Sequence, residues 1–442
     1  MATDPVFKII PATQKYDWGK VGLSSKVAQF AAASKIPGFT LDESAPYAEL
    51  WMGTHPSGPS RVLGTDEPLS KHLAANPQLM GQKVLQNFED AKEGNIPFLF
   101  KVLAIEKALS IQTHPDKETA KVLHKEHPDI YKDANHKPEM ALAITPFTAM
   151  CGFLPLPKLA SYIRSVPEFA ALIPTTISAA FLSLTSEDPS NPKVKTALKD
   201  MFSAVMTAEP GLFQSQLRAL VERYKNGNVR EEESDVKDLV LRLESQFPGD
   251  IGVFCAYMLN YVKLQPGEAI FLAAGEPHAY VSGDIMECMA TSDNVIRAGL
   301  TPKLRDIPNL VSGLTYNASD PSKHYVRPAP FPRADTFGVA IDLYDPPVPE
   351  FSVLQIKVPA AGSGGAGMSS EDGVPARKER VPAIDGPSIA IVTEGGGVME
   401  WGGKEGAQVG TGEVVFVGAG TEVTVEAQGG EGMVIYWAFV EA

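Results

Sequence analysis

The chain has 442 residues, a formal net charge of −14, 44% hydrophobic residues and 21% charged residues. This length predicts two or three domains, and the acidic balance disfavours nucleic acids and anionic membrane surfaces as partners, because both bind basic faces. The three cysteines form no disulfide framework, and no stretch has the composition of a signal peptide or a membrane-spanning helix, so we expect a cytoplasmic protein from a reducing compartment.

The first 154 residues contain many short apolar runs that are typical of β-strands. Residues 98–106 are predominantly apolar, and apolar and polar residues alternate over residues 110–114. Both runs are bounded by proline or polar turn residues. We therefore expect this part of the chain to be rich in β-sheet.

Residues 155–250 instead show the spacing of amphipathic helices. Two apolar stripes recur every three or four residues. They are Phe213, Leu217, Leu220, Val221 and Tyr224, and then Val236, Leu239, Val240, Leu243 and Phe247. These stripes predict a block of packed helices, and the block contains no candidate catalytic residue.

Short strands return after residue 250. Residues 328–359 form a proline-rich connection, and residues 360–373 have the Gly- and Ser-rich composition of a flexible surface loop. The last 60 residues are apolar strands separated by glycine turns. This spacing predicts a small antiparallel barrel or sandwich at the C-terminus.

One short pattern occurs twice, 145 residues apart. Gly267, Glu268, Phe271, Ala274 and Gly275 recur as Gly412, Glu413, Phe416, Ala419 and Gly420. At this offset His278 aligns with Val423. The two matches predict two related β-barrels, of which only the first keeps a metal-binding side chain at this corner, although Gly-Glu turns before a strand are also common.

Gln112 and His114 are the first candidate ligands. Side chains two residues apart on a strand share a face, and Pro115 favours an extended backbone at His114. An amide oxygen and an imidazole on one face are suited to binding a metal. A Gln-x-His pair by itself is more often structural.

The stretch YKDANHKPEMAL (residues 131–142) places several polar and charged side chains within seven residues: Asp133, His136, Lys137 and Glu139. Pro138 favours an extended backbone at Lys137, so Lys137 and Glu139 are expected to share a face. In a functional site Glu139 would bind a metal while Lys137 faces the substrate. The alternative is a solvated turn before a strand.

A third segment, residues 275–303, contains His278 after a tight Gly-Glu-Pro turn and Arg297 among apolar neighbours. A partly buried arginine needs an anionic partner. The partner is either a structural carboxylate such as Asp293 or a bound phosphate or oxyanion. Together, Gln112, His114, Glu139 and His278 suit a divalent first-row metal, with zinc as the first choice and iron as the competitor.

These residues lie in long motifs that resemble the type I phosphomannose isomerase family of eukaryotes. The two signature stretches are YKDANHKPE (131–139) and HAYVSGDIMECMATSDNVIRAGLTPK (278–303), and the flanking segments YDWGK (16–20), AELWMGTHPSGPS (48–60) and FLFKVLAIEKALSIQTHPDK (98–117) also match. The resemblance implies a mainly β fold with α-helices. Its parts are a cupin-like jelly-roll catalytic barrel (1–154 and 251–325), an inserted α-helical domain (155–250) and a second cupin-like β-barrel (326–442).

The resemblance also implies an activity and a site. The family interconverts mannose 6-phosphate and fructose 6-phosphate with one zinc ion per chain, which supplies mannose 6-phosphate for GDP-mannose synthesis, glycosylation and cell-wall polymers. The implied metal ligands are Gln112, His114, Glu139 and His278; Arg297 is the implied active-site arginine, and Lys101, Ser110, Lys137, Glu287 and Asp293 line the pocket. A sugar phosphate is the expected partner, and the protein is expected to be a monomer.

Our mechanistic hypothesis is proton transfer between C1 and C2 through an enediolate. Arg297 and the metal would stabilise the developing oxyanion, and Lys137 is the candidate for proton transfer. Asp293 or His114 would assist ring opening, while Lys101 and Ser110 would contact the phosphate.

Three alternatives remain open at this point. The chain could be a sugar-phosphate sensor without turnover, although binding alone needs fewer ionisable groups at the reacting end. It could be an iron-dependent cupin oxygenase, which the amide ligand Gln112 disfavours. The C-terminal barrel could be an interaction module rather than a structural one, although Val423 leaves it without the corresponding ligand.

Overall fold

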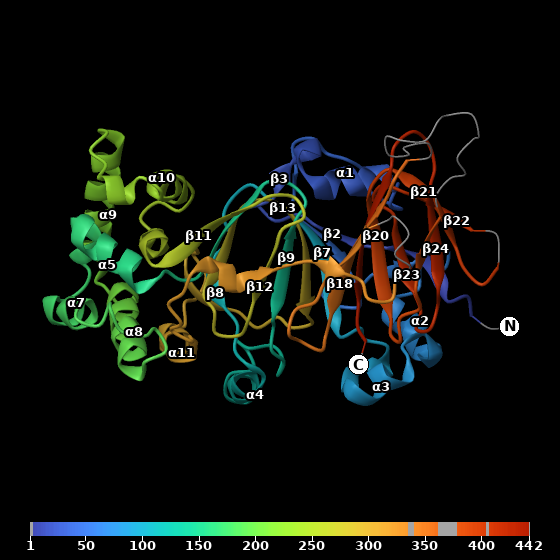
Figure 1. Ribbon diagram of the computed structural model, residues 1–442, viewed down its shortest axis with the longest axis horizontal. Coiled ribbons are helices and arrows are strands. Elements are labelled where there is room, and N and C mark those ends of the chain that lie inside the picture. The colour runs from blue at the N-terminus through green and yellow to red at the C-terminus, as the bar shows by residue number, and fades with distance from the viewer. Residues whose placement is uncertain (1–2, 335–339, 361–377, 404–405, 442) are drawn as a thin grey trace.

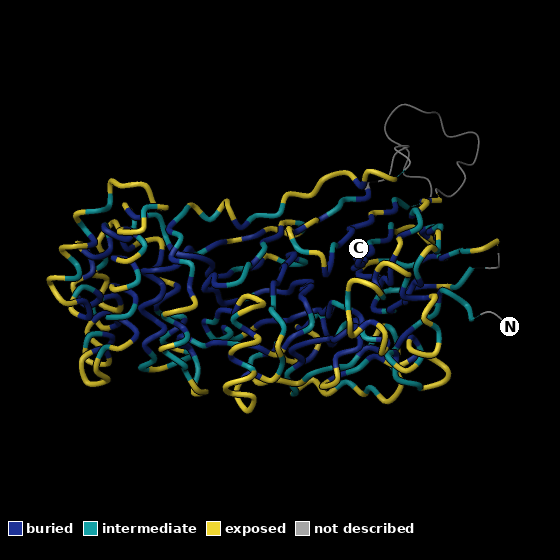
Figure 2. Tube along the Cα trace, turned by 90° about the horizontal axis from the view of Figure 1, so that it is seen from below, coloured by how far each residue is buried: buried dark blue, intermediate teal, exposed yellow. Residues whose placement is uncertain are grey.

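The computed structural model describes residues 3–334, 340–360, 378–403 and 406–441, so most of the Gly- and Ser-rich segment 360–373 lies outside the described residues. Three parts follow one another along the molecule (Figure 1): a helical block, a central β region and the C-terminal sheets. Buried chain runs through all three parts (Figure 2). Among the described helices, none is both long enough and apolar enough to cross a membrane.

The central sheet has 11 strands. Its main path runs β15-β12-β9-β13-β7-β5-β2, and β8, β10, β11 and β14 join it at the side. The strands are β2 (Ala12–Gln14), β5 (Glu49–Met52), β7 (Phe98–Ile105), β8 (Ile111–Thr113), β9 (Glu139–Ala143), β10 (Phe147–Phe153), β11 (Leu259–Leu264), β12 (Ala269–Leu272), β13 (His278–Ala290), β14 (Ile296–Gly299) and β15 (Tyr325–Val326).

The 13-residue strand β13 organises this sheet. Its first residues pair with β8 and β10, and its second half pairs with β7 and β9. The change of partner occurs near Gly283, which has a φ of +115° and where a Cβ atom would lie 2.6 Å from the carbonyl oxygen of Pro146. Glycine therefore permits the close approach at this crossing.

The predicted helical block is present between β10 and β11. Its helices are α5 (Leu156–Ser165), α6 (Pro167–Ala170), α7 (Thr175–Leu182), α8 (Pro192–Met206), α9 (Pro210–Lys225) and α10 (Lys237–Gln246), and η4 (Glu231–Glu233) lies between the last two. Both predicted stripes face the core: α9 buries Phe213, Leu217, Leu220, Val221 and Tyr224, and α10 buries Leu239, Val240 and Leu243. The helical periodicity thus correctly predicted which faces pack.

Two sheets form the C-terminal part. The 8-stranded sheet has the order β16 (Ala329–Pro330), β17 (Ala340–Tyr344), β18 (Ser352–Val358), β25 (Met433–Phe439), β20 (Ser388–Glu394), β23 (Val414–Val417), β1 (Val6–Ile10) and β6 (Arg61–Val62). The 4-stranded sheet has the order β19 (Lys378–Val381), β24 (Val423–Ala427), β21 (Gly396–Glu400) and β22 (Ala407–Gly410). The N-terminal strand β1 therefore lies beside C-terminal strands, which the local sequence pattern did not predict.

The 8-stranded sheet packs on both faces. Along β20, Ile389 and Ile391 belong to a core shared with the central strands, whereas Ala390 and Val392 belong to the core shared with the 4-stranded sheet. This alternation is the period of two of a strand buried on both sides. The C-terminal part is thus joined to the central sheet by a continuous hydrophobic core.

The remaining elements connect or cover the sheets. They are β3 (Lys20–Val21) and β4 (Pro46–Tyr47), which pair with each other, α1 (Lys26–Ala33), α2 (Leu69–Ala75), α3 (Gln82–Asn87), α4 (Lys117–Glu126) and α11 (Ile307–Gly313), with the short 3₁₀ turns η1 (Gly22–Ser24), η2 (Pro77–Leu79), η3 (Glu89–Glu93), η5 (Ile251–Tyr257) and η6 (Pro321–His324).

The predicted fold class, mixed β and α with an inserted helical block, is confirmed. The predicted barrels need a correction, because the described strands of each sheet form open paths whose end strands do not pair with each other. The boundaries of the three predicted domains remain a prediction.

The internal repeat has a structural counterpart. At the offset of 145 residues, β12 corresponds to β23 and the first residue of β13 corresponds to the first residue of β24. The turn glycines match, with φ of +90° at Gly267 and +84° at Gly412. In both turns the glutamate carboxylate accepts a hydrogen bond from the backbone three residues earlier, at 2.7 Å for Glu268 and 2.9 Å for Glu413. The two segments therefore share one local design.

Candidate metal and substrate site

Strand register brings three of the predicted site residues together. Gln112 on β8 lies opposite His278 on β13, and on its other side it lies opposite Arg297 on β14. Directly opposed residues of antiparallel strands project to the same face. Gln112, which is half-buried, therefore sits between a predicted metal ligand and the predicted active-site arginine.

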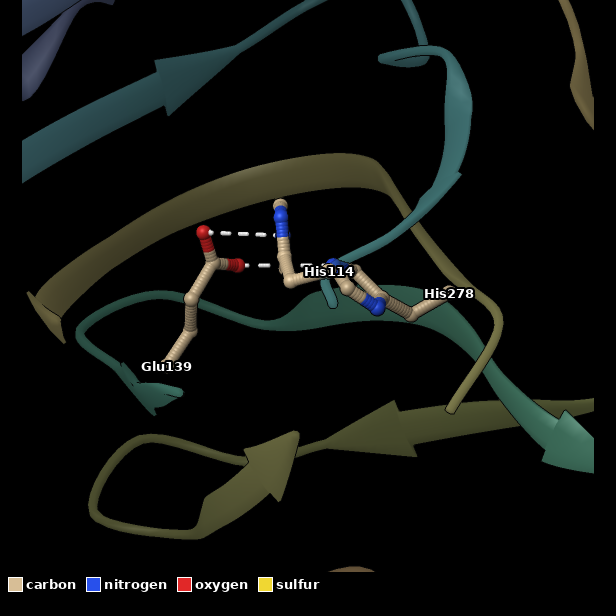
Figure 3. A group of neighbouring side chains, drawn as sticks. All are labelled: His114, Glu139 and His278. Atoms are coloured by element: carbon tan, nitrogen blue, oxygen red, sulfur yellow. Dashed lines mark ion pairs between the residues drawn. The ribbon is translucent and has the colours of Figure 1, made fainter. Parts of the chain in front are cut away.

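His114, Glu139 and His278 form a buried cluster (Figure 3). One potential ligand atom from each residue lies within 4.8 Å of the others. His114 Nε2 is 3.3 Å from one carboxylate oxygen of Glu139, and His278 Nε2 is 3.4 Å from the other. The carboxylate and both imidazoles thus converge from the residue after β8 and from the first residues of β9 and β13.

Backbone carbonyl groups fix both imidazoles. Nδ1–H of His114 donates to the carbonyl of Asn294 at 2.7 Å, and Nδ1–H of His278 donates to the carbonyl of Glu276 at 2.9 Å. Each Nε2 atom is then turned toward the Glu139 carboxylate, and among the described residues neither makes a hydrogen bond. Burial lowers the pKa of His114 to about 4, so its ring is neutral at pH 7. A neutral, oriented imidazole such as that of His114 is what a metal requires.

Glu139 is held in its ionised form. Burial alone would raise its pKa, but the ammonium group of Lys137 is the largest of the influences that outweigh burial and keep the pKa well below its usual value. Lys137 Nζ lies 3.2 Å from Oε1, and the Tyr280 hydroxyl donates to Oε2 at 3.4 Å. Lys137 and Glu139 therefore do face the same side, as the sequence predicted.

Lys101 lies in a second charged group on β7 and β13. Its ammonium is 3.1 Å from Glu287 and 3.5 Å from Glu49, and it lies 5.0 Å from the ring centre of Trp51. Burial opposes the charge on Lys101, but the carboxylates outweigh burial and raise its pKa. Burial is also the main reason that the pKa of Glu287 is raised. Lys101 is thus a buried cation compensated by two carboxylates.

Arg297 has no carboxylate partner among the described residues, and burial of its half-exposed guanidinium lowers its pKa. The alternative of a structural pair with Asp293 is not formed. Asp293 instead lies 3.4 Å from His55, whose hydrogen bond is the main cause of the lowered pKa of Asp293. Arg297 is therefore free to meet an anionic group. Ser110, which is half-buried, immediately precedes β8.

Three residues around the site were not predicted from the sequence, and a fourth, Asp133, was singled out there without a role. Glu49, Trp51 and His55 belong to a flanking motif that gave no chemical signal of its own. Asp133 is a hydrogen-bond acceptor for Ser292 Oγ at 2.8 Å and for the Asp293 amide at 2.7 Å. Asp133 thus ties the 131–139 loop to the segment that supplies Asp293 and the carbonyl of Asn294.

Comparisons with known proteins agree with this geometry. Residues 6–156 match the model for the catalytic domain of type I phosphomannose isomerase, and residues 172–259 match the model for its helical insertion domain. The mannose-6-phosphate isomerase of Cryptococcus neoformans is 46% identical, with 99% of each chain covered. The chain belongs to the type I phosphomannose isomerase family. The Saccharomyces cerevisiae mannose-6-phosphate isomerase is 42% identical, again over 99% of each chain.

Solved structures of phosphomannose isomerases share the fold. A variant of the Salmonella typhimurium phosphomannose isomerase has a TM-score of 0.79 at 27% sequence identity, covering 99% of this chain and all of that one. A zinc-bound mannose 6-phosphate isomerase has a TM-score of 0.77, with the same identity and coverage. The family is one of isomerases, and the sequence-based family assignment is confirmed.

Proposed function

We propose that this phosphomannose isomerase family member interconverts mannose 6-phosphate and fructose 6-phosphate with one bound zinc ion. The observation that carries the proposal is the convergence of two oriented imidazoles on one ionised carboxylate, beside an arginine that has no carboxylate partner in the described parts of the chain. The names of the relatives supply the substrate. The same proposal assigns the chain a role in supplying mannose 6-phosphate for GDP-mannose, glycoproteins and cell-wall polymers.

The residues at the site fit zinc. His114, Glu139 and His278 offer two nitrogen ligands and one oxygen ligand, and Gln112 on the same face is the proposed fourth. Their buried Nε2 atoms have no other partner among the described residues. When bound, zinc supplies a Lewis acid that polarises a substrate oxygen. Iron uses a similar donor set, and metal analysis distinguishes the two.

Lys137 is the proposed proton carrier. The reaction must move a weakly acidic proton between C1 and C2, which requires a base within hydrogen-bond reach of the substrate. Lys137 is largely buried, and its ammonium points toward Glu139 at the centre of the metal cluster. A sugar whose carbonyl lies at this cluster would place its reacting carbons next to Lys137.

Arg297 and Asp293 are proposed to act at the reacting end of the sugar. A guanidinium without a carboxylate partner is available to stabilise the charge that develops on the enediolate oxygens. Asp293, which is nearly half-exposed, is proposed to accept the hydroxyl proton during ring opening.

Lys101 and Ser110 are the proposed phosphate contacts, with Glu287 lining the pocket. The two carboxylates beside Lys101 weaken its attraction for a dianion, because their combined charge exceeds its own. Lys101 therefore needs the Ser110 hydroxyl, and the positive charge of the bound metal nearby, to hold a phosphate.

An assay for fructose 6-phosphate formed from mannose 6-phosphate tests the proposal. It is run on the purified protein, after chelation, and after zinc is added back. Loss on chelation and recovery with zinc are expected. A folded, zinc-loaded protein that binds mannose 6-phosphate without producing fructose 6-phosphate would contradict the proposal and favour a sugar-phosphate sensor.

A further inference from the structure

A hydrogen bond between His136 and Glu350 joins the 131–139 loop to the C-terminal part of the molecule. His136 Nε2 lies 2.6 Å from one carboxylate oxygen of Glu350, 214 residues further along the chain. Glu350 is only 3% exposed and belongs to the connection between β17 and β18. The loop that contains Lys137 and leads into Glu139 thus has a contact outside the central sheet.

The buried carboxylate of Glu350 depends on His136 as its hydrogen-bond partner. Its second oxygen, Oε2, is buried and has no hydrogen-bond partner among the described residues. A buried carboxylate is costly unless it is paired. Within the described chain, the partner of this carboxylate is His136, through the hydrogen bond to its other oxygen. Because Glu350 is buried, water cannot readily take the place of His136 as the partner of its carboxylate.

The chain around Glu350 is fixed to the core. Phe351 is 1% exposed and packs in the hydrophobic cluster shared by the central and 8-stranded sheets, against which Val348 also packs. Prolines 346, 347 and 349 restrict the backbone that leads to Glu350. The carboxylate is thus presented from a rigid support rather than from a free loop.

The side chains of the consecutive residues His136 and Lys137 point in different directions. Lys137 precedes a proline, which favours an extended backbone, and neighbouring side chains of an extended chain point to opposite sides. Lys137 accordingly reaches Glu139 at 3.2 Å while His136 reaches Glu350. The contact of Glu350 with His136 therefore also restrains the backbone of the adjacent Lys137.

The rest of the loop is held from within the central region. Asp133 accepts hydrogen bonds from the 292–293 segment, and the Asn135 amide donates to the carbonyl of Thr291 at 3.0 Å. Residues 132–138 lie outside any helix or strand. Glu350 thus restrains the loop from the C-terminal part of the molecule, through His136, the residue next to Lys137.

We propose that Glu350 is a positioning residue through which the C-terminal part orients Lys137. This inference rests on the proposed isomerase function. The C-terminal sheets then have a role in the reaction. They have this role although their copy of the repeated turn has Val423 where the first copy has the proposed ligand His278.

The test compares Glu350→Gln with Glu441→Gln. The second variant removes an exposed ion pair with Arg333, at 2.8 Å, that lies wholly within the C-terminal part. For Glu350→Gln we expect kcat to fall by about 10- to 100-fold, because small misplacements of a reacting group have such effects. KM and zinc content should stay close to wild type, and amide hydrogen exchange over residues 131–139 should become faster. Glu441→Gln should change none of these.

His136→Gln and the double variant Glu350→Gln/His136→Gln complete the cycle. If the two residues act as one unit, the double variant loses no more kcat than the worse single variant. Unchanged kcat and unchanged exchange in Glu350→Gln, or fully additive losses, would overturn the inference. If Glu350→Gln does not fold, Glu350→Asp, which keeps the charge but shortens the reach, replaces it with the same expected direction.

The readouts separate this inference from the proposed function. Wild-type protein without isomerase turnover would overturn the function, and the hydrogen-exchange comparison would still show whether Glu350 holds the loop. Active wild-type protein with an indifferent Glu350→Gln variant would overturn the inference alone.

Discussion

The two repeated turns, residues 267–278 and 412–423, have the same backbone but face different neighbours. His278 begins β13 opposite Gln112, whereas Val423 begins β24 opposite Val381. Both residues are 1% exposed. The comparison teaches that the turn supplies a rigid position, while the facing strand decides whether that position belongs to a polar site or to an apolar core.

The two regions also differ in what they bury. Around the first turn the buried side chains include Lys101, His114, Glu139, His278 and Glu287. Around the second turn, Val381, Val423, Val425 and Trp437 belong to one apolar cluster. Buried charges lower the free energy of unfolding unless each has a partner. We therefore expect the charged site in the central sheet to contribute less to stability than the apolar cluster of the C-terminal sheets.

The largest expected effect comes from making the first turn resemble the second. His278→Val removes one of two imidazole ligands, and we expect zinc affinity to fall by more than about 100-fold, since losing only an outer partner of a ligand costs about 10- to 100-fold. Turnover should become undetectable. Metal analysis and the coupled assay measure both effects.

The matched control for this change is His72→Val. His72 lies on α2 and pairs with Glu67, outside the metal cluster. The control should keep its zinc and its turnover. A His278→Val protein that retains one zinc per chain and near-normal turnover would show that the cluster is not the metal site.

Lys137→Met tests the proton carrier with the metal ligands intact. We expect kcat to fall by about 10²- to 10⁴-fold, the usual contribution of a general base, while zinc content stays at one per chain. Lys132→Met, a change at an exposed lysine of the same loop, is the control. Turnover equal to wild type in Lys137→Met would remove this lysine from the mechanism.

Arg297→Lys should have a smaller effect. Lysine keeps the positive charge but loses the planar, forked donor geometry, so we expect kcat/KM to fall by at most about 100-fold. Arg305→Lys, at an arginine that bonds the carbonyl of Ala298, serves as control. Equal rates for Arg297→Lys and wild type would mean that charge alone suffices at this position.

Val423→His makes the converse change in the second turn. Because the residue directly opposite on β19 is the apolar Val381, where His278 has Gln112, we expect no second zinc ion and no change in turnover. Burying an imidazole without a partner should lower the free energy of unfolding by about 1–3 kcal/mol, which denaturant titration measures. Binding of a second zinc ion would contradict the view that the facing strand decides the site.

Local patterns predicted much of the site. The alternation of residues 110–114 predicted Gln112 and His114 on one face, which remains a prediction. Pro138 predicted that Lys137 and Glu139 face the same side, which the structure shows. The helical stripe of α9 was predicted residue by residue, whereas the stripe of α10 was predicted one residue too long at each end, at Val236 and Phe247. These features depend on neighbours within a few positions, which is why sequence periodicity carries them.

The features that were missed depend on distant residues. The pairing of β1 with β23 and the contact of His136 with Glu350 each join positions hundreds of residues apart. The closed barrels were wrong because strand spacing fixes the presence of strands but not whether the end strands of a sheet meet. Similarly, Glu49 has no spacing signal and the role of Asp133 could not be predicted, since their partners come from other strands and loops.

Zinc titration of the metal-free protein, with turnover followed at each addition, tests the central claim most directly. The account predicts that turnover is absent at the start, rises in proportion to zinc and reaches its plateau at one ion per chain, and that His278→Val shows no such rise. Full turnover without metal, or a plateau that requires a second ion, would contradict it.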